Sequence, residues 1–160
     1  MPLRSRPFAL AATVLASAVL AAGAPDGASG RGAELVIENA ARGRTVRVSL
    51  RPGEVFSVVS QHSMYDQPVT EEFVVDQQGR IVLETVESPS AAVREYFGLT
   101  GPGARHAVVR AMREVVFRVA AGAPQRLRAG GVERSFLELG EHGDRLVMRA
   151  APIVPGRARP

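Results

Sequence analysis

Short runs of alternating apolar and polar residues, each closed by a glycine or proline turn, constrain the fold of this chain most strongly. Arg44 to Leu50 is the clearest run, because Val46, Val48 and Leu50 recur at every second position. Side chains two apart share one face of an extended strand, so this spacing predicts a strand with one buried face. Pro52-Gly53 then ends it.

Similar runs recur about every 8–12 residues along the chain, the spacing of small antiparallel domains. Shorter runs between residues 106 and 150 are split by glycine and proline and bring the expected total to about eight or nine short strands. The five clearer runs are 33–39, 44–50, 55–62, 69–76 and 80–87. The sequence therefore predicts an all-β fold, either an antiparallel sandwich or a partly open barrel.

One segment breaks the strand pattern. Ser88-Pro89-Ser90 supplies a helix cap with proline at the first helical position, and Val93, Tyr96 and Phe97 follow with the spacing of one helical face. We expect one short amphipathic helix near 89–97 that packs on the sheet as a lid.

The N-terminus has the features of an export signal. In residues 1–24, two arginines precede an apolar run of about 15 residues from Phe8 to Ala22, with small residues after it. This run is shorter than the roughly 20 residues that span a bilayer, so we expect cleavage after Ala21 or Gly23. An uncleaved segment would instead anchor the protein in the membrane.

The remaining chain is expected to form one domain: a flexible lead-in over 25–32, a β-domain over 33–151 and a C-terminal tail over 152–160. The formal net charge is only +4 and the arginines are interleaved with carboxylates, which does not favour nucleic-acid binding. Because the chain has no cysteine, disulfides, thiolate nucleophiles and thiolate metal sites are excluded.

The candidate site lies in an expected hairpin, Ser57 to Asp76. A register that pairs His62 with Val69 or with Glu71 places the facing side chains of both strands on one side of the sheet. Ser60, His62 and Glu71 then form a polar corner on an otherwise apolar face. The matching sets are Phe56, Val58, Ser60 and His62 on one strand and Val69, Glu71, Phe73 and Val75 on the other.

This corner has three interpretations. His62 and Glu71 can form a structural pair that fixes the loop from Ser63 to Pro68, since buried polar groups need partners. The same corner, partly exposed, can recognise a small anion or a protein. A serine hydrolase would use Ser63 as nucleophile, His62 as base and Glu71 or Glu72 to orient it. Adjacent residues on a strand point to opposite faces, and no Gly-x-Ser-x-Gly turn surrounds Ser63, which argues against hydrolysis.

The sequence predicts no metal site and no cofactor. His62, His106 and His142 are far apart in the chain and lack metal-ligand spacing. The arginines of the second half are interpreted as solvated, although Arg105 and Arg110 could reach a carboxylate near the loop.

The hairpin resembles a known family. His62-Ser63-Met64 followed by Pro68 to Phe73 is similar to the H-S-V-x-x-x-P-V-x-E-x-F signature of domain of unknown function 1850. The family's histidine, serine, proline and glutamate fall on His62, Ser63, Pro68 and Glu71. The resemblance covers about residues 34–150, but only the hairpin is specific. This chain departs from the family at Ser60, where an aromatic residue is frequent, and in the 91–101 region, where the family often has a glycine-rich turn.

The resemblance implies a location and a context and no reaction. Members are small exported bacterial proteins, and many are encoded beside TAXI-type TRAP transporters. It thus implies a periplasmic or otherwise extracytoplasmic location and a TRAP transporter component as partner. Our leading hypothesis is a non-enzymatic accessory or recognition protein in that context. Two alternatives stay open: a weak serine hydrolase built on Ser63 and His62, and a structural envelope protein whose hairpin edge adds a strand to a partner.

Overall fold

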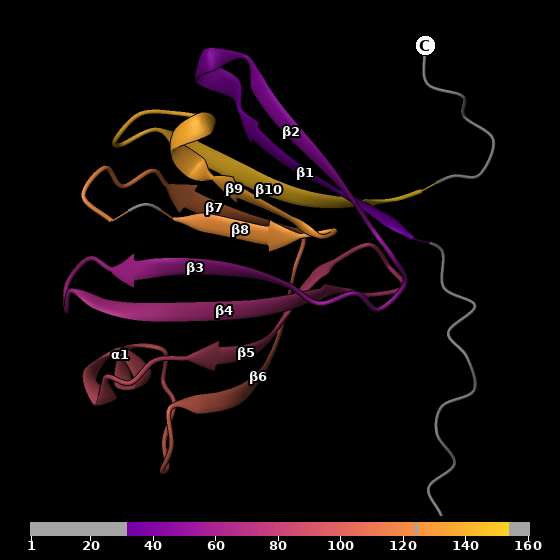
Figure 1. Cartoon of the computed structure of the whole chain (residues 1–160). Helices are drawn as coiled ribbons and strands as arrows, with labels where there is room; N and C mark the ends of the chain where they lie inside the picture. The colour runs from indigo at the N-terminus through magenta and orange to yellow at the C-terminus, as the bar shows by residue number, and fades with distance from the viewer. Residues whose placement is uncertain (1–31, 124, 154–160) are drawn as a thin grey trace, which may run out of the picture.

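A computed structural model of the protein describes residues 32–123 and 125–153 (Figure 1). The expected export signal at 1–24, the lead-in up to residue 31 and the tail from residue 154 lie outside the described residues. Within the described ranges, no helix is long and apolar enough to cross a bilayer.

The described chain is an all-β sandwich with one short α-helix, as expected. It has ten strands where eight or nine were expected, because the interrupted segment before residue 136 forms four separate short strands. The elements in chain order are β1 (Ala33–Asn39), the 3-10 turn η1 (Ala40–Arg42), β2 (Arg44–Leu50), β3 (Phe56–His62), β4 (Gln67–Val75), β5 (Ile81–Glu87), α1 (Ala91–Tyr96), β6 (Arg105–Met112), β7 (Glu114–Arg118), β8 (Arg126–Ala129), β9 (Val132–Ser135), the 3-10 turn η2 (Phe136–Glu138) and β10 (Arg145–Pro152).

The first sheet joins the two ends of the described chain. Its strand order is β2-β1-β10-β7, so β1 and β10 run side by side although more than a hundred residues separate them (Figure 1). Every second residue of β1 is buried, and Leu35 and Ile37 are completely so. This alternation places one face of the sheet against the core.

The second sheet has the order β6-β5-β4-β3-β8-β9, with antiparallel pairing throughout. The β3–β4 hairpin therefore lies in the middle of the sheet and is not an edge to which a partner strand could be added. Only Arg113 separates β6 from β7, so the chain crosses between the sheets at this point, and the sheets do not close into a barrel.

The facing sides of the two sheets form the core. Phe56 and Phe73 stack with ring centroids 5.4 Å apart, and Val58 is completely buried, as the hairpin pattern predicted. The helix α1 adds Val93 to this core. The expected cap was two residues too early: the N-cap is Ser90, whose side chain accepts a hydrogen bond from the Val93 N–H, and Pro89 precedes the helix.

Candidate functional site

The register of the β3–β4 hairpin pairs His62 with Gln67. The expected pairing of His62 with Val69 or Glu71 is therefore wrong. The connecting turn is only Ser63–Asp66, and β4 begins two residues earlier than expected. Because turn length sets the register of a hairpin, the shorter turn places Glu71 opposite Val58, four residues along β3 from His62. Both side chains still share the face of the sheet that was predicted.

Glu71 lies on the apolar inner face, directly between Val58 of β3 and Val86 of β5. Both neighbours are completely buried, and no hydrogen bond to the Glu71 carboxyl is present in the described chain. Burial raises the pKa of Glu71 to about 7, although the positive charge of Arg110 acts in the opposite direction. Glu71 is thus a half-buried carboxyl that changes charge near neutral pH.

The turn is fixed by Gln61 and Asp66 in place of the expected His62–Glu71 pair. The His62 carbonyl accepts hydrogen bonds from the N–H groups of Tyr65 and Asp66, at 3.2 and 2.8 Å. The Gln61 side chain donates to the Asp66 carboxylate at 2.6 Å and to its carbonyl at 3.1 Å. Asp66 adopts a φ of 51°, a conformation that asparagine and aspartate tolerate better than most residues.

The His62 ring is enclosed by aromatic side chains. It stacks on Tyr65 with centroids 5.1 Å apart and meets Tyr96 edge-on at 4.5 Å and Phe97 at 6.4 Å. We call these four residues the aromatic tip. The Nδ1 atom of His62 is buried there and has no hydrogen-bond partner in the described chain. Met64, at the turn, is 69% exposed, and Tyr96 is 61% exposed.

A buried serine holds α1 against the hairpin. The Ser88 hydroxyl donates a hydrogen bond of 2.8 Å to the Pro68 carbonyl and accepts one from the Ser90 N–H. Arg94 then donates to the carbonyls of Ser88 and Pro89, at 2.9 and 3.0 Å. Pro68 therefore belongs to the framework of the aromatic tip through its backbone carbonyl, which ties the helix to β4.

Ser63 and Glu72 do not join His62 in a catalytic arrangement. Ser63 is exposed in the turn, and no hydrogen bond between it and His62 occurs in the described chain. Glu72 lies on the opposite face of β4 from Glu71, where it forms an ion pair with Arg105. Arg105 also reaches Glu87 at 3.4 Å, so the expectation that it contacts a carboxylate is confirmed.

The other two histidines form local contacts. The His106 Nε2 atom lies 3.0 Å from the Gly103 carbonyl, and the His142 Nδ1 atom accepts a hydrogen bond of 3.3 Å from the Ala121 N–H. Within residues 32–123 and 125–153, no three side chains of the metal-binding types come together.

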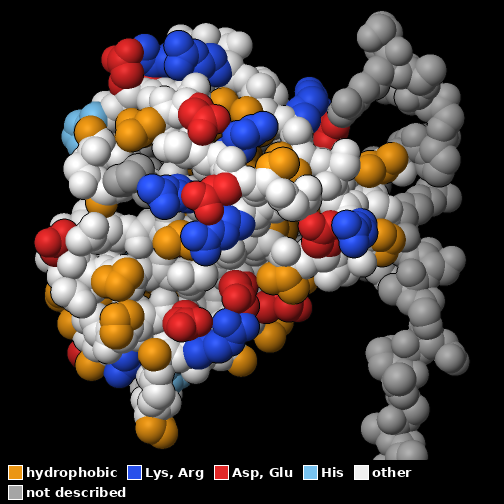
Figure 2. All heavy atoms as spheres, in the orientation of Figure 1, with side chains coloured by type: hydrophobic (Ala, Val, Ile, Leu, Met, Phe, Trp, Pro, Cys, Tyr) orange, Lys and Arg blue, Asp and Glu red, His pale blue; other side chains and the backbone are white. Residues whose placement is uncertain are grey.

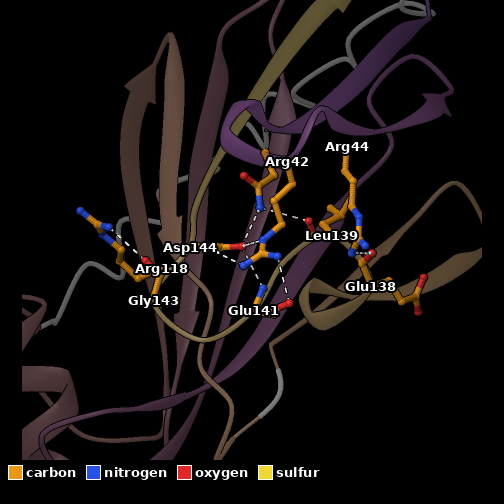
Figure 3. A network of polar contacts seen from close by, with 9 residues as sticks. Arg42, Arg44, Arg118, Glu138, Leu139, Glu141, Gly143 and Asp144 are labelled. Carbon is orange, nitrogen blue, oxygen red and sulfur yellow. Dashed lines mark hydrogen bonds and ion pairs between the residues drawn. The ribbon is translucent and has the colours of Figure 1, made fainter.

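A second polar cluster joins η1 to the loop before β10 (Figure 3). Arg42 forms ion pairs with Asp144 and, at 2.9 Å, with Glu141, and Asn39 donates hydrogen bonds to Asp144 and to the Leu139 carbonyl. The bond from Arg42 is the main reason why the pKa of Asp144 lies below its usual range. These side chains form hydrogen bonds and ion pairs with one another, apart from the Asn39 Oδ1 atom. We therefore interpret the cluster as structural. The sequence did not predict this cluster, because about a hundred residues separate its two halves.

The outer face of the six-stranded sheet is chemically mixed. Figure 2 shows basic and acidic side chains interleaved over β3, β4 and the β8–β9 hairpin, and apolar side chains gathered at the end that carries the β3–β4 turn and α1. A shallow hollow of about 410 Å³ lies beside the β8–β9 hairpin, but Arg128 in its lining is already paired with Glu133. The aromatic tip is therefore the stronger candidate.

No protein-family model, curated protein or solved structure matches this chain. The resemblance to domain of unknown function 1850 accordingly stays a prediction from the hairpin sequence.

Proposed function

We propose that this protein is a non-enzymatic recognition domain that binds a protein partner through the aromatic tip. The observation that carries this proposal is the composition of the exposed turn and helix: Met64 and Tyr96 are largely exposed, and Tyr65 is 38% exposed. Aromatic residues and methionine are enriched in protein interfaces, where a few of them supply most of the binding energy.

The framework supports the proposal because it holds these side chains in place before binding. The hairpin lies between β5 and β8, and the bonds of Ser88 with Pro68 and Ser90 fasten α1 to it. A preorganised surface loses little conformational entropy when it binds. A small anion is a poorer ligand here, because the described contacts of His62 are aromatic and include no arginine.

The hairpin resemblance supplies the cellular context of the proposal. The N-terminal segment directs the chain out of the cytoplasm, and the domain assists a solute transporter of the TRAP type by contacting one of its extracytoplasmic parts. If the segment is uncleaved, it also tethers the domain to the membrane.

A photocrosslinking experiment tests the proposal. A photoreactive amino acid replaces Met64 in the full chain, expressed in its own host, and the matched control carries it at Val109, which is 91% exposed on β6. We expect a crosslink from position 64 to a transporter subunit, identified by mass spectrometry, that the additional change Tyr96→Ala removes. Equal crosslinking from both positions, or none to a transporter subunit from position 64, would contradict the proposal.

A further inference from the structure

β7 is the last strand of its sheet, and within residues 32–123 and 125–153 no strand pairs with its outer edge. The Val119 N–H donates to the Asp144 carbonyl at 2.9 Å, and the Val119 carbonyl accepts from the Gly143 N–H at 2.8 Å. Main-chain groups of an antiparallel strand alternate between its two edges. The N–H and C=O groups of Val116 and Arg118 therefore point away from β10, toward the outer edge.

The outward side chains of β7 carry opposite charges at the two ends of the strand. Glu114 lies at one end, Val116 in the middle and Arg118 at the other end, and alternation places all three on the outer face. Val116 is 45% exposed. The strand thus presents an acid, an apolar residue and a base at equal spacing.

Arg118 is poorly compensated within its own chain. The register places it directly opposite Arg145 of β10, and like charges in opposed positions destabilise a sheet. Glu114 is paired with Arg149 at 2.7 Å and lies 3.6 Å from Arg145. Within the described ranges, no carboxylate lies within ion-pair distance of Arg118, which donates only to the Gly143 carbonyl (Figure 3).

We propose that β7 pairs with β7 of a second copy of this chain, antiparallel and about a twofold axis through Val116. In this register Arg118 lies opposite Glu114 of the second copy, and the two Val116 side chains meet at the axis. Glu114 of the second copy then lies beside Arg118, which has no carboxylate partner within its own described chain. The four-stranded sheets become one continuous sheet across both copies, with both cores on the same side.

The other terminal strands lack this self-complementarity. β2 and β6 contain arginines and no carboxylate, so pairing with a second copy would bring no opposite charges together. β9 contains Glu133 and Arg134, but as neighbours they point to opposite faces and cannot face each other in such a pair. Charge complementarity therefore selects β7 as the edge and a second copy as its occupant.

Cysteine crosslinking tests the register. The chain has no cysteine, so Val116→Cys in the full chain introduces the single thiol. Directly opposed residues of an antiparallel pair have Cα atoms about 5.5 Å apart, within the range of a disulfide. We expect a covalent dimer after mild oxidation and little from the matched control Val109→Cys. Equal crosslinking of both variants would overturn the proposal.

Charge exchange tests the pairing without a crosslink. Arg118→Glu places a carboxylate opposite Glu114 of the second copy, and we expect the dimer dissociation constant, measured by analytical ultracentrifugation, to rise at least about tenfold. The double variant Glu114→Arg/Arg118→Glu restores opposite charges and should restore dimerisation, with circular dichroism confirming the fold of each. A monomeric wild type at every concentration, or a dimer unaffected by Arg118→Glu, would overturn the proposal.

Discussion

Replacement of Glu71 by glutamine should change how the stability of this protein depends on pH. The Glu71 carboxyl lies between two buried valines, and burial raises its pKa from 4.5 to about 7. The folded state therefore binds this proton more tightly than the unfolded state. The resulting stabilisation is complete below pH 4.5 and is lost as the pH rises through 7.

The size of the effect follows from the same two values. A pKa difference from 4.5 to about 7 corresponds to about 3 kcal/mol of folding free energy, since each pKa unit is worth about 1.4 kcal/mol. Between pH 5 and pH 8 the wild type should lose about 2.5 kcal/mol through this group. Glutamine has the same shape and no charge, so Glu71→Gln should not lose this contribution.

Urea denaturation of the full chain at pH 5 and pH 8 measures the difference. The comparison of wild type with Glu71→Gln cancels the contributions of all groups that the two proteins share. Glu84→Gln is the matched control, because Glu84 is exposed on the neighbouring strand β5, and it should follow the wild-type profile. Parallel profiles of wild type and Glu71→Gln would refute the reasoning and show that water solvates this carboxylate in the folded protein.

Three further outcomes are expected. Ser88→Ala removes the donor to the Pro68 carbonyl from a part-buried contact and should lower the unfolding free energy by about 1 kcal/mol in urea titrations; no loss would mean that water replaces the hydroxyl. Gly140→Ala places a methyl group 2.8 Å from the Asp144 carboxylate and should cost about 1–3 kcal/mol by the same measurement; an unchanged midpoint would show that the loop before β10 yields. A fluorophosphonate probe should leave Ser63 unlabelled by mass spectrometry, and labelling that depends on His62 would revive the hydrolase alternative.

The local elements could be predicted from sequence because their signals are local. β1 and β2 span the predicted residues, since strict alternation marks both faces of a strand. The Ser88-Pro89-Ser90 segment located α1 for the same reason, although the residue that caps the helix is Ser90 and Pro89 lies before it. The inner face of the hairpin also follows from alternation alone, which is why Phe56 and Phe73 are buried as expected.

The candidate site was only partly predictable, because its contacts depend on register and docking. A turn two residues shorter than expected moved Glu71 opposite Val58 and removed the predicted pair with His62. The rings of Tyr96 and Phe97 reach His62 only because α1 folds back onto the hairpin. No local sequence pattern predicts this packing of α1 on the hairpin, since it depends on contacts between segments that are distant in the sequence.

The pairing of β1 with β10 also has a consequence for the timing of folding. β1 is among the first described residues to be synthesised, yet its register with β10 needs residues up to Pro152. Contacts between such distant segments make folding slow, because the entropy of closing the loop is lost before the contact forms. The first sheet therefore cannot be completed on a nascent chain that stops before Arg145. A truncated chain that stops before Arg145 leaves the edge of β1 that pairs with β10 without its partner strand, and unpaired strand edges promote aggregation.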